Sequence, residues 1–113
     1  MKKIDAVIMP FRLDAVKDVL CSLGLHGMTI TEIKVPGAKD SHAGILKRTD
    51  CFTEFIPKLM IEIIVPDSIA EKTVEMINRS VNLQSDMNDR IFISDIEEAV
   101  RISTAQKGED AIT

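Results

Sequence analysis

The sequence FIPKLMIEIIV at residues 55–65 decides the fold. Its aliphatic and β-branched residues alternate with the period of a β-strand, and the run ends at Pro66. Between positions 59 and 65 only Glu62 is charged, so both faces of this strand are largely apolar. Such a strand must be covered on both faces, which places it centrally in a sheet and favours an oligomer in which sheets face each other.

The segments on either side of this strand predict a βαββαβ order. Gly24 ends the first helical pattern, and the triplet Pro66-Asp67-Ser68 begins the second. This order is typical of an α+β, ferredoxin-like fold with both helices on one face of the sheet. The other three strands are expected at residues 4–9, 28–35 and 90–96, and the helical patterns at residues 13–23 and 69–81.

Length and composition narrow the class of protein. A chain of 113 residues is expected to form one domain, residues 1–113. Its net charge of −4 argues against direct nucleic-acid binding, and no apolar run approaches the roughly 20 residues of a membrane span. Without a signal-peptide pattern, we expect a cytoplasmic protein. Within the domain we distinguish a protruding loop at about 37–54, a turn at about 82–90 and a C-terminal segment at 97–113.

The loop at about 37–54 is polar, contains glycine and shows no periodicity. Loops of this length in a small domain are usually functional or disordered. Lys39, Lys47 and Arg48 make it basic, and Lys58 follows shortly after it. We interpret these cations either as solvated charges or as contacts to an anionic effector or an acidic partner surface.

Three potential metal ligands, Asp40, His42 and Cys51, lie in the same loop. Their spacing matches no recognised metal motif, so no metal site is expected. A metal- or redox-responsive regulator that uses His42 and Cys51 is nevertheless the alternative function. Thr49 is a candidate for phosphorylation.

The sequence carries no catalytic constellation, so we expect no enzyme. It lacks a P-loop, an HExxH motif and an activated nucleophile beside histidine and aspartate. An acylphosphatase-type hydrolase on this fold would need a glycine-rich loop around an arginine, and Met9-Pro10-Phe11-Arg12 has no glycine. His26 is interpreted as structural, and Cys21 is expected in or near the core.

Five stretches cover most of the chain, at residues 1–20, 27–34, 55–67, 90–102 and 108–112. In order and in register, they closely resemble the PII signal-transduction family. The resemblance implies a compact homotrimer whose clefts between subunits bind ATP or ADP, with no prosthetic group. Many members also bind 2-oxoglutarate together with Mg-ATP, and their protruding loops dock onto ammonium channels, metabolic enzymes or transcription regulators.

The resemblance also implies the binding residues. Arg90 stands at a usual lysine on the phosphate side, and Lys58 matches the lysine that helps to hold 2-oxoglutarate. The full set implied for nucleotide binding is Gly27, Met28, Thr29, Gly37, Glu62, Ile64, Arg90 and Arg101.

The chain departs from the family on the phosphate side. The glycine-rich turn, usually close to TGKIGDGK, is LQSDMNDR at residues 83–90. Glycines let backbone N–H groups approach a phosphate, and Asp86 and Asp89 add negative charge instead. Lys39 replaces the glutamine that coordinates the metal ion, and Ser103 replaces a second arginine. We therefore expect weakened triphosphate binding and no ordinary Mg-ATP–2-oxoglutarate site, which favours ADP or AMP while ATP and Mg²⁺ stay open.

The usual covalent switch of the family is also missing. Relatives are usually controlled by nucleotidyl transfer to a loop tyrosine, and Cys51 occupies that position here. Since the 113 residues include no tyrosine, uridylylation or adenylylation of tyrosine is excluded. The resemblance therefore implies a regulator that keeps the fold of the family but lacks its usual site of covalent modification.

Overall fold

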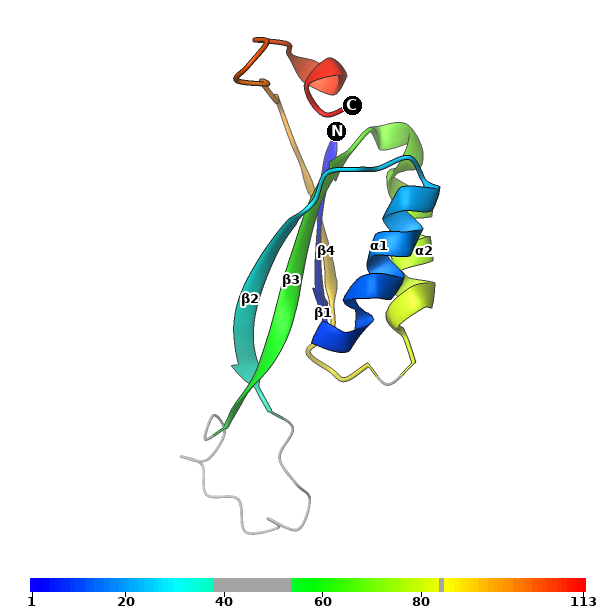
Figure 1. Cartoon of the computed structure of the whole chain (residues 1–113), viewed down its shortest axis with the longest axis vertical. Coiled ribbons are helices and arrows are strands. Elements are labelled where there is room, and N and C mark those ends of the chain that lie inside the picture. Colours follow the sequence, from blue (N-terminus) through cyan, green and yellow to red (C-terminus); the bar gives the residue numbers. More distant parts are fainter. Residues whose placement is uncertain (38–53, 84) are drawn as a thin grey trace.

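The computed structural model describes residues 1–37, 54–83 and 85–113. Figure 1 shows a curved sheet with two helices packed against it. Every predicted helix and strand is confirmed, with bounds shifted by a few residues at most. The elements are β1 (Lys2–Ile8), the 3-10 turn η1 (Pro10–Arg12), α1 (Leu13–Ser22), β2 (Thr29–Pro36), β3 (Phe55–Val65), α2 (Asp67–Val81), β4 (Ile91–Asp95) and the 3-10 turn η3 (Gly108–Ala111).

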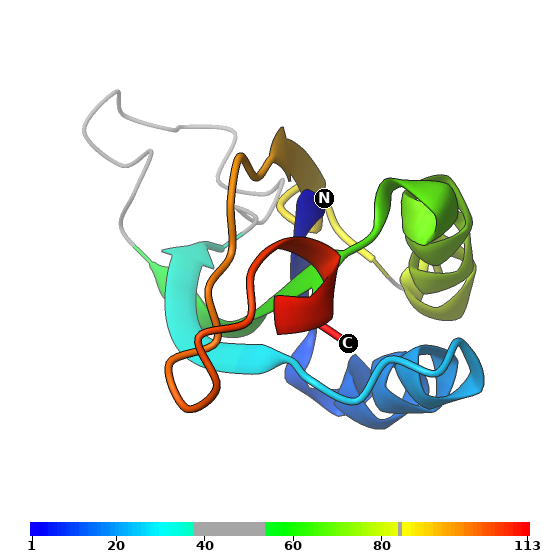
Figure 2. The same cartoon turned by 90° about the horizontal axis from the view of Figure 1, so that it is seen from above.

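The sheet is antiparallel and its strand order is β2-β3-β1-β4. Ile4 lies opposite Ile63 of β3 and opposite Ile93 of β4, which fixes the register of the three strands. Both helices cover the same face of the sheet, as Figure 2 shows from above. The α+β, ferredoxin-like architecture expected from the sequence is therefore confirmed.

The core forms between that face and the two helices. Ile61, Ile63 and Val65 of β3 are almost fully buried there, as the alternation in residues 55–65 predicts. Val16 and Leu20 of α1 pack against them, and α2 contributes further aliphatic side chains. On the other face of β3, Met60, Glu62 and Ile64 are half-buried in the single chain.

Cys21 does not lie in the core, so the interpretation of this residue was wrong. Its side chain is an exposed free thiol on α1. Val16 and Leu20, four residues apart, define the buried stripe of the helix. The next residue is turned about 100° away from Leu20, which carries Cys21 off that stripe.

Neither helix in the described part of the chain has the length and apolar character needed to cross a membrane.

Because β3 supplies the centre of the core, truncating Ile61 should destabilise the protein strongly. We expect Ile61→Ala to lower the free energy of unfolding by about 2–5 kcal/mol, measured by urea denaturation. The matched control is Ile102→Ala, since Ile102 is 98% exposed and its loss should change that free energy by less than about 0.5 kcal/mol. Equal effects of the two variants would contradict the assigned core.

Candidate effector site

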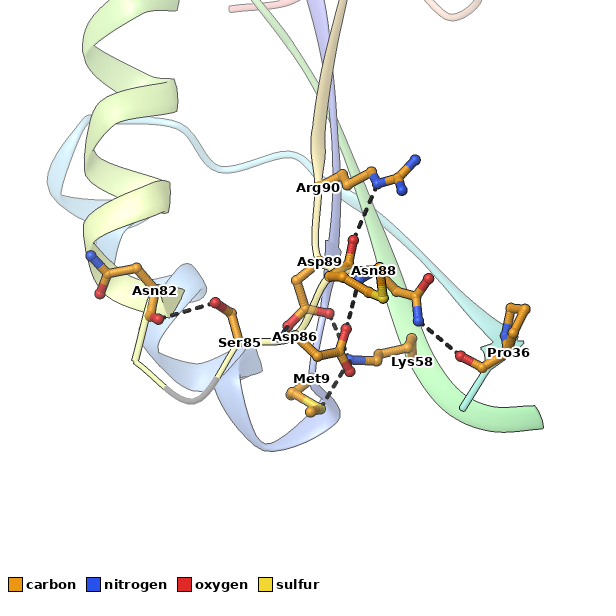
Figure 3. Close-up of polar contacts among 10 residues, drawn as sticks. Met9, Pro36, Lys58, Asn82, Ser85, Asp86, Asn88, Asp89 and Arg90 are labelled. Carbon is orange, nitrogen blue, oxygen red and sulfur yellow. Dashed lines mark hydrogen bonds and ion pairs between the residues drawn. The ribbon is translucent and has the colours of Figure 1, made fainter. Parts of the chain in front are cut away.

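The turn between α2 and β4 has no glycine, and three of its described backbone N–H groups bond to acceptors within the turn. The main-chain N–H of Asn88 donates to Asp86 Oδ1 at 2.8 Å. The N–H of Asp86 donates to Asp89 Oδ2 at 3.3 Å, and the N–H of Asp89 donates to the main-chain oxygen of Asp86 at 3.1 Å. Three N–H groups that a phosphate-binding turn would offer to a ligand are therefore already engaged (Figure 3).

Lys58 of β3 reaches the same turn, and its side chain is fully buried. Its Nζ donates to Asp86 Oδ2 at 2.7 Å and to Asp89 Oδ1 at 2.6 Å. A third, weaker contact runs to Met9 Sδ at 3.2 Å (Figure 3). The lysine is therefore not a solvated cation, and its described anionic partners are two carboxylates of its own chain.

The charges in this cluster stabilise one another. Burial lowers the pKa of Lys58, but hydrogen bonds with Asp86 and Asp89 outweigh it, so the pKa is raised overall. For Asp86, burial raises the pKa, because it disfavours the charged carboxylate. The hydrogen bonds from Lys58 and from the N–H of Asn88 outweigh this effect, so the pKa of Asp86 lies below its ordinary value. The ammonium and this carboxylate therefore both remain charged at neutral pH.

The turn is also tied to neighbouring segments. The Asn88 side-chain amide donates to the main-chain oxygen of Pro36, the last residue of β2, at 2.8 Å. Arg12 of η1 donates to the main-chain oxygen of Leu83 at 2.6 Å. One residue beyond Pro36, the N–H of Gly37 donates to the main-chain oxygen of Glu54 at 2.9 Å. The turn therefore contacts the stem from which the 37–54 loop departs.

The residues implied for the adenine side lie at and just before the start of β2, and on the second half of β3. Thr29 lies directly opposite Glu62 in the sheet, and Gly27 and Met28 precede it. Lys3 of β1 lies opposite Ile64, and its Nζ contacts the Glu62 carboxylate at 2.9 Å. That contact lowers the pKa of Glu62, which is therefore a charged acceptor at neutral pH.

The two arginines implied for the phosphate side occupy different segments. Arg90 is exposed just before β4, and its Nε donates to the main-chain oxygen of Met87 at 3.3 Å. Arg101 lies in the C-terminal segment, where Nη2 donates to the main-chain oxygens of Thr113 at 2.6 Å and Ala111 at 3.3 Å. Its Nε is buried without a hydrogen-bond partner.

The groove beside the phosphate-side turn does not include the residues implied for the adenine side. Among the described residues, no hydrogen bond or ion pair joins Arg101 to residues 27–29 or to the turn. A groove of about 700 Å³ between α2 and β4 includes Arg90 and Asp89 in its lining, but neither Glu62 nor residues 27–29. This groove therefore includes only part of the set of residues implied for nucleotide binding.

The sequence candidates in the loop fall outside the residues that the structure describes. Within residues 1–37, 54–83 and 85–113, no group of three potential metal-ligating side chains comes together. The candidates outside that range are Lys39, Asp40, His42, Lys47, Arg48, Thr49 and Cys51.

Sequence reasoning identified Asp86 and Asp89 as added negative charge but missed their pairing with Lys58. The spacing Asp-x-x-Asp in a turn is a usable signal for side chains that bond nearby backbone N–H groups. Lys58 is 28 residues from Asp86, and nothing local in the sequence specifies that contact.

The lowered pKa of Asp86 predicts a specific acid sensitivity. A carboxyl whose pKa is lower in the folded state contributes stability above its unfolded value of about 4, and this is lost as the pH falls through the folded value. Urea denaturation between pH 7 and pH 3 should therefore show a smaller loss of unfolding free energy for Asp86→Asn than for wild type. Asp18→Asn, which alters an exposed carboxylate of α1, should keep the wild-type slope. Identical slopes for wild type and Asp86→Asn would contradict the pairing.

Comparison with known proteins agrees with this fold. The sequence profile described as nitrogen regulatory protein P-II matches residues 1–106. The chain is 42% identical to the nitrogen regulatory protein P-II of Bradyrhizobium diazoefficiens and 39% identical to that of Azospirillum brasilense. It is 38% identical to nitrogen regulatory protein P-II 1 of Escherichia coli K12. Each match spans 112 residues, 99% of this chain and 100% of the relative. The chain therefore belongs to the nitrogen regulatory protein P-II family, whose members are regulatory signal transducers and not enzymes.

Proposed function

We propose that this chain is a cytoplasmic, homotrimeric P-II regulator that senses ADP or AMP in preference to Mg-ATP with 2-oxoglutarate. The observation that carries the proposal is the engagement of the phosphate-side turn by its own carboxylates. The N–H groups of Asp86, Asn88 and Asp89 and the Nζ of Lys58 are all bonded within the chain. A terminal phosphate at this turn would displace those bonds and meet two negative charges.

The nucleotide would lie between subunits. Residues Gly27, Met28 and Thr29, with Glu62 and Ile64, would contact the adenine and ribose of one nucleotide. The guanidinium groups of Arg90 and Arg101 would contact its phosphates by charge-assisted hydrogen bonds. Two observations support a site shared between subunits: both faces of β3 carry apolar residues, and the groove at Arg90 does not include the adenine-side residues.

Signalling would follow from differential binding. The nucleotide must bind one arrangement of the 37–54 loop more tightly than another, or no switching occurs. The hydrogen bond from Asn88 to Pro36 supplies contact between the turn and the stem of that loop near Gly37. The partner would be an enzyme, a transporter or a transcription regulator, and the names of the relatives point to nitrogen metabolism.

Calorimetric titration with AMP, ADP and ATP, with and without Mg²⁺ and 2-oxoglutarate, tests the proposed effector. We expect ADP or AMP to bind at least as tightly as Mg-ATP, and 2-oxoglutarate to add no binding heat. Arg101→Ala should weaken nucleotide binding about tenfold or more, because hydrogen bonds to charged groups contribute about 1.5–3 kcal/mol. Arg79→Ala is the matched control, since Arg79 is an exposed residue of α2 paired with Glu75. Absence of adenine-nucleotide binding would refute the proposal.

Sedimentation equilibrium tests the proposed assembly. We expect a species of about three times the 12.5 kDa chain mass at micromolar concentration. A mass equal to that of one chain would leave the outer face of β3 uncovered and would contradict a site shared between subunits.

A further inference from the structure

We propose that Asp86 and Asp89 act as an internal anion that masks a carboxylate-binding position at Lys58. In this arrangement the protein carries its own ligand at that position, so external small carboxylates are excluded. The masking itself rests only on the contacts of Lys58, whereas its consequence for signalling rests on the proposed function.

The first argument is that every N–H donor of the Lys58 ammonium group already has a partner within the chain. An ammonium group has three N–H bonds and no acceptor. The Nζ of Lys58 has three partners, namely Asp86 at 2.7 Å, Asp89 at 2.6 Å and Met9 Sδ at 3.2 Å. An external anion could bind only by displacing one of them.

The second argument is the cost of burying charge. The Lys58 side chain has no exposed surface, and a buried ammonium requires an anionic partner to remain charged. Some carboxylate must therefore occupy this position in the folded protein. In this chain the occupant comes from the turn, so its effective concentration does not depend on the level of any metabolite.

The third argument is that the same two carboxylates occupy the backbone donors of the turn. Asp86 Oδ1 accepts from the N–H of Asn88, and Asp89 Oδ2 accepts from the N–H of Asp86. Each carboxylate therefore contacts the lysine with one oxygen and the main chain with the other (Figure 3). A bound carboxylate or phosphate held jointly by the turn and the lysine would make the same set of contacts.

The two carboxylates differ in access to solvent, and this difference makes the proposal testable. The side chain of Asp86 is 24% exposed, whereas that of Asp89 is 6% exposed. Truncating Asp86 would open a solvent-accessible space beside Lys58 while Asp89 still balances its charge. A small carboxylate from solution should fit that space.

Combined with the proposed function, the masking determines ligand selectivity. Asp86 and Asp89 would make the response independent of small dicarboxylates and leave the adenine nucleotide as the effector. They would thus be specificity-determining residues of the effector site, although neither has to contact the nucleotide.

The experiment is chemical rescue of Asp86→Ala with acetate and with 2-oxoglutarate as probes. Thermal unfolding is followed at pH 7 while each probe replaces chloride at constant ionic strength. Ligands that bind only the folded state raise Tm in a saturable manner. We expect both probes to raise the Tm of Asp86→Ala saturably, with half-saturation at a concentration about tenfold or more below any response of wild type.

The control is the double variant Lys58→Met/Asp86→Ala, which retains the opened space but lacks the cation. It should show no saturable response to either probe. The proposal is overturned if Asp86→Ala responds no better than wild type, or if the double variant responds as Asp86→Ala does. Neither outcome depends on adenine nucleotides, so failure of the proposed function would be recognised separately by calorimetry on wild type.

A second measurement applies if Asp86→Ala does not fold. Asp86→Asn retains the volume of the side chain and one acceptor oxygen, but it removes the charge and replaces the second oxygen with an N–H donor. Amine acylation followed by peptide mass spectrometry should show Lys58 protected in wild type and reacting about tenfold or more faster in Asp86→Asn, relative to exposed Lys72. Equal protection of Lys58 in both proteins would overturn the masking.

Discussion

The buried ammonium of Lys58 is the constraint on which the effector end of this molecule depends. A charge with no exposed surface must be balanced nearby, and here both balancing groups come from one short turn. Their bonds hold that turn against β3, and Asn88 of the same turn contacts the end of β2. The need to balance this one buried charge therefore holds the turn between α2 and β4 in place, beside the stem of the loop.

The fold itself depends on a different property, the apolar character of β3 on both faces. One face joins the helices in the core, and the other presents Met60, Glu62 and Ile64. This outer face also contains Thr29, opposite Glu62, so the surface that needs cover and the implied adenine position coincide. In the proposed trimer, assembly and effector binding would therefore share the same strands.

The elements of this fold could be predicted because their signals are local. Alternation in residues 55–65, helical spacing around Val16 and Leu20, and the breaks at Gly24 and Pro66 each lie within one element. Cys21 was misplaced because its residue type suggests burial, whereas its position beside Leu20 turns it off the buried stripe. A stricter use of the helical period would have placed it correctly.

The candidate site was less predictable because its determinants are distant in sequence. Loss of the turn glycines and gain of two aspartates indicated weakened phosphate binding. The sequence did not show which groups the two new carboxylates contact. Only the folded chain brings Lys58 to Asp86 and Asp89.

The most direct test of this account is a crystal structure of the wild-type protein grown with Mg-ATP and 2-oxoglutarate. The account predicts that Lys58 Nζ stays within about 3 Å of carboxylate oxygens of Asp86 and Asp89, with no dicarboxylate beside it. A 2-oxoglutarate carboxylate bonded to Lys58, with Asp86 turned away, would contradict it.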